Sequence, residues 1–343
     1  MSRVAVVLLN LGGPDARAAV RPFLTSLFAD PAIIALPNPL RWLLARLIAA
    51  RRATAAEAIY ARIGDASPLL ANTEAQARAL ERALGPEHRC FIAMRHWHPR
   101  SEAAARAVRE WGADEVLLLP LYPQFSSTTT ASSIAAWQRA ARAAGITAPT
   151  RALCCYPALD GFAAAIAERI AAARAAWPAT LPLRLLLSAH GLPKRVVARG
   201  DPYQWQVERT ALAIAARLGR DAPETVVCYQ SRVGPLAWLE PATDAEIRRA
   251  GAEGRGVIIA PIAFVSEHSE TLVELDMEYR HLAERSGVPR YVRVPTVGDD
   301  AVFIAGLAAL VRERRAGPAG VMPAGGRRIC PAGFALCACG RGA

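Results

Sequence analysis

Short apolar segments alternate with longer alanine- and arginine-rich segments along almost the whole chain. The apolar segments have the length and composition of buried strands, whereas the longer segments are typical of helices. Strands that alternate with helices in this way form parallel sheets that are covered on both faces. We therefore predict an α/β fold whose strands lie at residues 4–10, 90–94, 115–121, 183–188, 225–229 and 256–262.

The two halves of the chain resemble each other. The segment EVLLLPLYPQFSS (115–127) matches GVIIAPIAFVSEH (256–268) in its apolar run, its proline and the polar start of the next helix. We predict two similar domains at residues 1–150 and 151–316. Their parallel sheets are expected to face one cleft, because ligands bind at the carboxyl ends of such strands. Residues 317–343 are rich in Gly, Pro and Ala and are expected to form an irregular tail.

Composition argues against some classes of protein. The 343 residues carry a net charge of +11, but no arginine-rich block is interleaved with aromatic residues, so we expect no nucleic-acid partner. A basic surface would instead favour an anionic membrane or a substrate with carboxylates. The N-terminal segment does not have the pattern of a secretory signal, and no run of about 20 apolar residues occurs. These features predict a cytoplasmic protein without a transmembrane helix.

Residues 32–50, AIIALPNPLRWLLARLIAA, come closest to a membrane-binding segment. Prolines and arginines interrupt the segment, which is typical of an apolar lip or of a helix that lies at a membrane surface. We therefore expect a peripheral contact with the inner face of a membrane in the N-terminal domain. A buried helix that starts after prolines is the alternative. The sequence does not indicate an oligomeric state.

Acidic side chains follow the predicted strand at residues 256–262. If the segment SEHSETLVELDMEY continues as a helix, one face at about 100° per residue carries Glu267, Glu270, Glu274 and Glu278. Carboxylates stacked on one face repel each other, so the pattern does not stabilise a helix. Together with His268, this line of oxygen ligands is suited to carrying a divalent cation or protons.

Polar residues follow the ends of other predicted strands. His190 precedes Gly191 at a strand end, where an imidazole can exchange a proton; a hydrogen bond to the turn is the alternative. Arg95 follows another strand and suits an anionic group of a substrate, and a metal site on His96 and His98 is the alternative there.

Two loop segments have a binding interpretation as well. The segment NLGGP (10–14) lacks the spacing of a phosphate loop and predicts a tight turn that lets a flat ligand approach the backbone. The hydroxyl-rich segment YPQFSSTTTASS (122–133) either binds carboxylates or caps a helix.

Seven cysteines occur, an odd number that, without an export signal, argues against a disulfide framework. Cys330, Cys337 and Cys339 lie close together in the expected tail, and Cys154 and Cys155 lie upstream. This set can supply four thiolates to an iron–sulfur cluster. A zinc site and a group of unrelated thiols are the alternatives.

Taken together, the motifs resemble those of the ferrochelatases. They occur in the order found in that family, and the resemblance covers residues 3–312. The segments are LNLGGP (9–14), IYARIGDASPL (59–69), MRHWHP (94–99), YPQFSSTTTASS (122–133), SAHGLP (188–193), CYQSRVGPLAWLEP (228–241) and FVSEHSETLVELDMEY (264–279).

The resemblance implies a lyase of the metal-chelatase class, built from two Rossmann-like domains around a porphyrin cleft. Ferrochelatases insert Fe²⁺ into protoporphyrin IX to form protohaem and release two protons, the last step of haem biosynthesis. The implied partners are protoporphyrin IX and Fe²⁺, and no nucleotide is consumed. Coproporphyrin III or another divalent metal is the alternative substrate. A non-catalytic tetrapyrrole carrier and a periplasmic-type metal-binding protein are the alternatives to an enzyme.

The resemblance also implies roles for individual residues. His190 and Glu270 would lie at the porphyrin centre on opposite sides, with His190 accepting the pyrrole protons or helping to bind iron. The residues implied to handle Fe²⁺ are His190, Glu270, His268, Glu274 and Glu278. Those implied to contact the porphyrin are Leu11, Tyr60, Arg95, Ser127 and Trp238.

The cysteines resemble those of a bacterial subset of the family. In that subset one mid-chain cysteine and a C-x6-C-x-C motif hold a [2Fe–2S] cluster, so the implied ligands are Cys155 (or Cys154), Cys330, Cys337 and Cys339. Animal members place a cluster cysteine in the YPQ motif, where this chain has Ser126 and Ser127. Two further departures, Glu267 in place of Asp and Ser269 in place of an apolar residue, remove no catalytic group.

Overall fold

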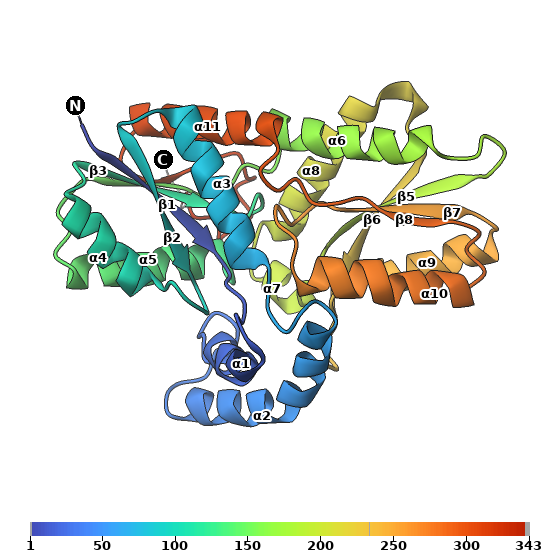
Figure 1. Ribbon diagram of the computed structural model, residues 1–343, viewed down its shortest axis with the longest axis horizontal. Helices are drawn as coiled ribbons and strands as arrows, with labels where there is room; N and C mark the ends of the chain where they lie inside the picture. Colours follow the sequence, from blue (N-terminus) through green and yellow to red (C-terminus); the bar gives the residue numbers. More distant parts are fainter. Residues whose placement is uncertain (1, 233, 340–343) are drawn as a thin grey trace.

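The computed structural model describes residues 2–232 and 234–339. Two parallel sheets lie side by side with helices packed on their faces. A pair of helices, α1 (Val20–Phe28) and α2 (Leu40–Ala61), projects below the sheets in the view of Figure 1. None of the helices in this described part of the chain is long and apolar enough to span a membrane.

The first sheet forms around β1, whose sequence VAVVLLN is buried throughout. A strand of this kind is stable only where helices cover both faces of the sheet. Within the described residues the strand order is β2-β1-β3-β4-β9, and neighbouring strands are parallel. The strands are β1 (Val4–Asn10), β2 (His88–Met94), β3 (Glu115–Pro120), β4 (Thr150–Leu153) and β9 (Gly320–Met322).

The second sheet repeats this arrangement. Its described strands follow the order β6-β5-β7-β8 and are parallel, so β5 lies between β6 and β7 as β1 lies between β2 and β3. The predicted likeness of the two halves and the predicted parallel α/β fold are both confirmed. The strands are β5 (Leu183–His190), β6 (Glu224–Gln230), β7 (Gly256–Pro261) and β8 (Tyr291–Arg293).

The strands predicted from apolar runs are all present, but β4, β8 and β9 are not among the predictions. These strands have four, three and three residues, which is too short for a periodic pattern to distinguish them from loops. Because β9 pairs with β4, part of the expected tail belongs to the first sheet. The prediction of a wholly irregular tail at 317–343 is therefore wrong, and residues 340–343 of that tail lie outside the described part.

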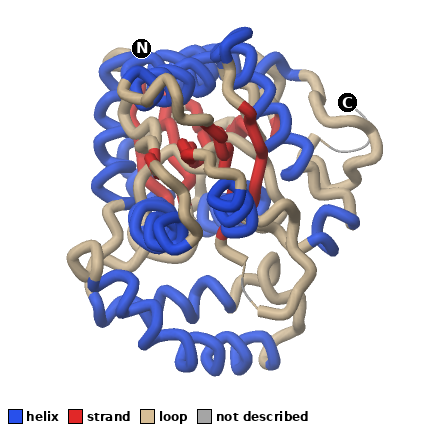
Figure 2. Tube along the Cα trace, turned by 90° about the vertical axis from the view of Figure 1, so that its right-hand side faces the viewer, coloured by secondary structure: helices blue, strands red, loops and turns tan. Residues whose placement is uncertain are grey.

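Helices lie on both sides of the strands (Figure 2). Short 3₁₀ turns occur at Arg17–Ala19, Gly219–Asp221 and Ala324–Gly326, and a π-helix occupies Glu270–Glu278. The remaining helices are α3 (Leu69–Leu84), α4 (Ser101–Trp111), α5 (Thr130–Ala143), α6 (Asp160–Ala175), α7 (Lys194–Ala198), α8 (Tyr203–Leu218), α9 (Thr243–Ala252), α10 (Tyr279–Arg285) and α11 (Ala301–Ala316).

One buried apolar cluster extends from the first sheet to the second, and it includes both Leu8 of β1 and Leu187 of β5. Helix α11 crosses between the two halves and packs against α3 and α6 (Figure 1). At this contact the rings of Phe162 and Phe303 lie 5.7 Å apart. Helix α11 and strand β9 come late in the chain, yet α11 packs against α3 and β9 pairs with β4 in the first half of the molecule. A domain boundary near residue 150 stays a prediction.

Candidate active site

The carboxyl ends of β5, β6 and β7 meet at one edge of the second sheet. His190, the last residue of β5, lies opposite Gln230 of β6, and Ser188 lies opposite Pro261 of β7. The chain runs outward from β5 to β6 in one direction and continues through β7 to β8 in the other, so the strand order reverses beside β5. Such a reversal is where α/β proteins bind their ligands.

His190 forms a direct pair with Glu270, the first residue of the π-helix that follows β7. The distance from His190 Nδ1 to Glu270 Oε2 is 3.0 Å, and the side chains are 41% and 32% exposed. Tyr203 of α8 donates its hydroxyl to the carbonyl oxygen of His190, which fixes the strand end. The placement of His190 and Glu270 on opposite sides of a bound porphyrin stays a prediction.

His190 and Glu270 each favour the charged form of the other. Burial lowers the pKa of His190, but the charge of Glu270 and its hydrogen bond outweigh that effect and raise the pKa above its usual value. Burial alone would raise the pKa of Glu270, yet His190 and His268 hold it well below its usual range. Glu270 is therefore a carboxylate that stabilises a protonated imidazole.

We expect the Glu270→Gln substitution to lower the pKa of His190, because it removes the negative charge and leaves the burial that opposes protonation. The imidazole would then lose its proton at a lower pH than in the parent protein. A pH titration of the His190 ring resonances by NMR measures this shift. Glu284→Gln, which removes an exposed acid on α10, is the matched control and should not change the pKa of His190.

His268 approaches the same carboxylate from the start of the π-helix. Its Nε2 lies 3.7 Å from Glu270 Oε2, and its Nδ1 is 3.2 Å from the carbonyl oxygen of Ser266. The ring of Phe264 lies 4.4 Å from that of His268 and 6.4 Å from that of His190, which gives the pair an aromatic wall. Glu270 is thus in contact with both histidines.

Within the described residues, no three His, Cys, Asp or Glu side chains are arranged as a ready site for one metal ion. His96 is buried and His98 is exposed, so the alternative of a metal pair on these histidines gains no support. The set His190, Glu270, His268, Glu274 and Glu278 stays a prediction for residues that handle a metal substrate.

Glu274 accepts hydrogen bonds from the residue that follows β6 and from the first residue of α10. Its oxygens accept the backbone N–H of Ser231 at 2.8 Å, the Ser231 hydroxyl, and the Tyr279 hydroxyl at 2.9 Å. Ser231 has a φ of 59°, a left-handed conformation that is uncommon for serine and that directs its N–H at Glu274. Burial and the nearby Glu270 nevertheless raise the pKa of Glu274. Two neighbouring acids with pKa values moved in opposite directions can divide proton-accepting and proton-donating roles.

The acidic segment is a π-helix, and the line of carboxylates is shorter than predicted. The N–H of Tyr279 donates to the carbonyl oxygen of Glu274, five residues back, as in a π-helix. Glu267 precedes this helix and binds Arg293 Nη1 and the N–H of Thr296, both at 2.9 Å. The prediction that Glu267 belongs to the line is therefore wrong. The remaining members are Glu270, Glu274 and Glu278.

Glu278 ends this line at the surface. It is 48% exposed and forms an ion pair with Arg62 at 3.0 Å. Arg62 follows α2, so the contact also joins the helical pair to the second half of the chain. Farther in, Asn72 donates to the carbonyl oxygen of Glu267 at 3.1 Å and Gln76 to that of Val265 at 3.1 Å. These contacts fix the loop before the π-helix against α3.

Tyr60, one of the predicted porphyrin contacts, interacts electrostatically with Glu270 of the histidine–glutamate pair. It is buried near the end of α2, its hydroxyl interacts with Ser269, and burial raises its pKa to about 12. Trp238 lies beside the turn after His190, where the backbone of Pro193 bridges to it. Leu11 follows β1 and is half-buried.

The other two predicted porphyrin contacts are engaged by protein groups. Arg95 pairs with Asp30 at 2.7 Å and donates to the Ser132 hydroxyl at 2.7 Å. Ser127 donates both its backbone N–H and its hydroxyl to Asp201 at 2.7 Å. The structure therefore gives these side chains a role in holding loops, and their contact with porphyrin stays a prediction.

Gly191 allows β6 and Trp238 to approach the turn after His190. A Cβ atom at this position would lie 2.7 Å from the carbonyl oxygen of Gln230 and 3.3 Å from Trp238 Cε3. We expect Gly191→Ala to cost about 1–3 kcal/mol of stability by overpacking and to displace His190. Thermal unfolding and activity together measure this effect. Gly333→Ala is the control for the loss of a glycine, because that glycine does not have a left-handed backbone and a Cβ there meets nothing within 4 Å.

Sequence reasoning misses Ser231, Tyr203 and Asp201. Ser231 follows the end of β6 within a motif that already contains strand-end polar residues, so the rule that singles out His190 applies to it too. Tyr203 and Asp201 act through hydrogen bonds to backbone atoms of His190 and Ser127. No sequence pattern marks such a contact.

A second cluster of chemically active groups lies against α8, beside Gln206. The sulfurs of five cysteines are buried together with Phe125, and none of them forms a disulfide. Cys154 Sγ lies 3.3 Å from Cys155 Sγ and 3.8 Å from Cys339 Sγ. The amide of Gln206 points at the sulfurs of Cys155 and Cys330, at 3.4 and 3.2 Å. The full set is Cys154, Cys155, Cys330, Cys337 and Cys339.

The architecture has a counterpart among solved structures. SirB from Bacillus subtilis with Fe³⁺ matches with a TM-score of 0.50 at 15% sequence identity, over 92% of this chain and 96% of that one. At this identity the likeness concerns the fold alone. The two parallel sheets define an α/β protein of this fold, and the histidine–glutamate pair at the strand ends is its candidate active site.

Sequence comparison identifies the family within this class. The family model for ferrochelatase matches residues 3–315. Ferrochelatases from Phenylobacterium zucineum (strain HLK1) and Caulobacter vibrioides (strain NA1000 / CB15N) are 53% and 52% identical, and each match covers 99% of this chain and 99% of the relative. The chain therefore belongs to the ferrochelatase family, as its motifs predict, and is a metal-chelatase enzyme.

Proposed function

We propose that the enzyme inserts Fe²⁺ into protoporphyrin IX to form protohaem, with release of two protons, as the last step of haem biosynthesis. Membership of the ferrochelatase family supports this reaction. The observation that carries the proposal is the His190–Glu270 pair, 3.0 Å apart at the end of β5. Glu274 and Glu278 follow on the same π-helix, and Glu278 lies at the surface.

The chemistry gives each of these groups a step. A free-base porphyrin loses its central N–H protons as the metal enters, and bending of the bound macrocycle exposes the nitrogen lone pairs. Because His190 Nδ1 faces Glu270, Nε2 is the ring nitrogen that accepts a pyrrole proton. The charge of Glu270 stabilises the resulting imidazolium. Glu274, with its raised pKa, then accepts this proton from His190 and passes it toward Glu278 and solvent, so that His190 can accept the second pyrrole proton.

The reaction is tested by anaerobic incubation of the full chain with Fe²⁺ and either protoporphyrin IX or coproporphyrin III. Loss of porphyrin fluorescence reports metallation. We expect faster turnover, measured as kcat/KM, with protoporphyrin IX. A preference for coproporphyrin III would assign the other substrate, and binding without metallation of either porphyrin would favour a carrier.

We also propose that the cysteine cluster holds a [2Fe–2S] group. Its thiols are free, buried and adjacent, and the Gln206 amide is placed to donate hydrogen bonds to two sulfurs, so the donor set fits. Cys330, Cys337 and Cys339 from the tail and Cys155 or Cys154 from the segment after β4 would supply the ligands. When bound, such a group carries one electron and links the tail to the first sheet.

Finally, we propose that α2 contacts a membrane surface. Large apolar side chains are exposed on this helix and just before it: Leu36, Leu40, Trp42, Leu43 and Leu47, at 39–58%. Apolar residues of this size gathered on one projecting helix are typical of an interaction surface. Their exposure disfavours the alternative of a fully buried helix for residues 32–50. Such a contact fits an apolar porphyrin substrate, which partitions into lipid.

A further inference from the structure

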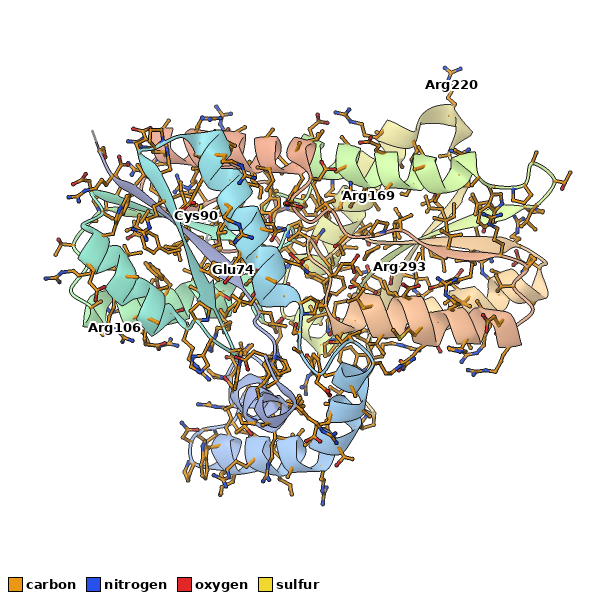
Figure 3. The ribbon with its side chains drawn as sticks, viewed as in Figure 1. Glu74, Cys90, Arg106, Arg169, Arg220 and Arg293 are labelled. Atoms are coloured by element: carbon orange, nitrogen blue, oxygen red, sulfur yellow. The ribbon has the colours of Figure 1, made fainter. Side chains whose placement is uncertain are left out.

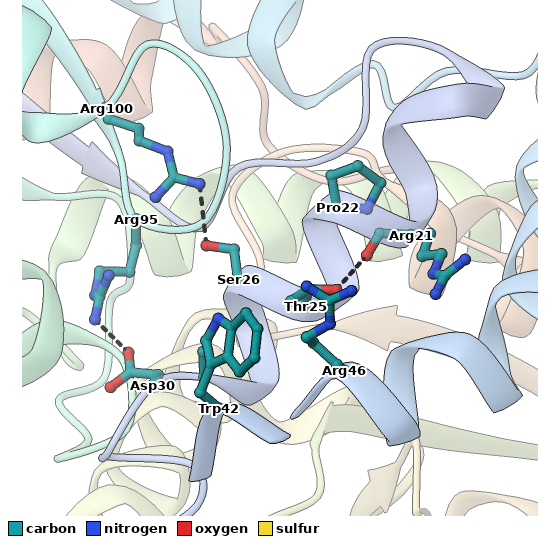
Figure 4. A pocket seen from close by; sticks show the side chains of 10 residues that line it. Arg21, Pro22, Thr25, Ser26, Asp30, Trp42, Arg46, Arg95 and Arg100 are labelled. Atoms are coloured by element: carbon teal, nitrogen blue, oxygen red, sulfur yellow. Dashed lines mark hydrogen bonds and ion pairs between the residues drawn. The ribbon is translucent and has the colours of Figure 1, made fainter. Parts of the chain in front are cut away.

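A cavity of about 690 Å³ lies between α1, the start of α2 and the loop that follows β2. Figure 4 shows Arg95 and Arg100 on one side of the cavity and Arg21 and Arg46 on the other. We call this the arginine cavity. Its volume is that of a site for a small organic ligand. Of the residues given a role above, only Arg95 and Trp42 line it.

The positive charge of the arginine cavity is not matched by acids. Asp30 is the single carboxylate among the described lining residues, and it pairs with Arg95 at 2.7 Å. Arg100 donates to the Ser26 hydroxyl at 3.2 Å, and Arg46 stacks over the ring of Trp42 at 4.6 Å. Within the described part of the chain, Arg21, Arg46 and Arg100 form no ion pair with an acidic side chain. Three guanidinium groups therefore remain to bind an anion.

The arginine cavity is separate from the site around His190. Val20, Phe23 and Leu24 of α1 pack with Tyr60, which belongs to that site. Arg21, Thr25 and Ser26 line the cavity, and at 3.6 residues per turn they project from the opposite face of α1. Of the predicted porphyrin contacts, only Arg95 also lines the cavity, and Asp30 already holds its guanidinium.

We propose that the arginine cavity binds the phosphate group of an organic phosphate. A planar guanidinium pairs bidentately with phosphate oxygens, and a tetrahedral phosphate offers oxygens to several arginines at once, whereas a carboxylate offers two. The cavity opens beside Trp42, and the exposed side chains of Leu43 and Leu47 continue along α2. This position suits the headgroup of an anionic phospholipid, and a soluble phosphate ester shares the same chemistry.

The test uses the full chain and two ligands. Calorimetric titration with glycerol 3-phosphate measures the cavity without a membrane. Co-sedimentation with phosphatidylcholine vesicles, with and without phosphatidylglycerol, measures the headgroup; this second arm rests on the membrane contact proposed for α2. The cavity variant is Arg21→Gln combined with Arg46→Gln. Its control is Arg106→Gln combined with Arg139→Gln, which removes the same charge from the exposed faces of α4 and α5; Figure 3 shows Arg106 on α4, away from α1 and α2.

We expect the cavity variant to weaken binding at least about tenfold and the control to change it by less than about twofold. A loss confined to phosphatidylglycerol vesicles assigns a lipid headgroup, and a loss confined to glycerol 3-phosphate assigns a soluble ester. Equal effects of the two variants, or no binding of either ligand by the parent protein, would overturn the proposal. So would a raised KM for porphyrin with unchanged phosphate binding, because the cavity would then serve the porphyrin. The cavity variant should metallate porphyrin at the parent kcat. A loss of phosphate binding is then distinguishable from a failure of the proposed reaction.

Discussion

The His190→Ala variant is expected to bind porphyrin and to metallate it at least about a hundred times more slowly than the parent protein, since a positioned general base contributes about 10²–10⁴-fold. The substitution removes the ring nitrogen that accepts the pyrrole proton and leaves Glu270 without its partner at 3.0 Å. Because the side chain is 41% exposed, its loss opens no buried cavity and the fold should persist. Fluorescence quenching in anaerobic single-turnover experiments measures the metallation rate, and porphyrin titration without Fe²⁺ measures binding.

His281→Ala is the matched control for this prediction. His281 lies on the exposed surface of α10, downstream of the same π-helix, and its ring interacts with the carbonyl oxygen of Met277. The control should metallate porphyrin at the parent rate. Normal turnover of His190→Ala with both porphyrins would remove His190 from the mechanism and leave Glu270 and Glu274 as the groups to test.

The position of His190 is predictable from sequence because it depends on strand ends alone. An apolar run such as LRLLLSAH fixes a buried strand, and the residue at its carboxyl end lies at the ligand-binding edge whatever the neighbouring strands do. The same reasoning finds β1, β3 and β7. It does not find β4, β8 or β9, whose three or four residues are held by pairing with a neighbour.

The arrangement of the acidic segment could not be predicted from the helical period. The wheel assumes 100° per residue, whereas the chain forms a π-helix with hydrogen bonds to the fifth residue back. Glu267 leaves the line because Arg293 binds it, and Arg293 belongs to β8, one of the short strands that the sequence pattern misses. Figure 3 labels Arg293 within the second half of the molecule. The direct contact of His190 with Glu270 likewise depends on tertiary packing.

Serine substitutions of the clustered cysteines should abolish binding of the proposed [2Fe–2S] group. Each iron of such a group takes two cysteines, so four ligands need to form two close pairs. The structure brings Cys154 within 3.8 Å of Cys339 and lets Cys330 interact with Cys337. Cys155 is held near Cys330 by the amide of Gln206. Five thiols are therefore available for four positions, and the extra one is Cys154 or Cys155.

The expected result is about two irons and two sulfides per chain in protein purified without oxygen, with the visible absorption of a [2Fe–2S] cluster. Cys337→Ser should lose both elements and the absorption, because its sulfur lies between those of Cys330 and Cys339. Of Cys154→Ser and Cys155→Ser, the one that loses iron identifies the fourth ligand. Cys90→Ser, which alters a half-buried cysteine on β2, should retain the full content. Colourless parent protein without iron or sulfide would contradict the proposal. One zinc per chain instead of iron would assign the cysteines to a zinc site.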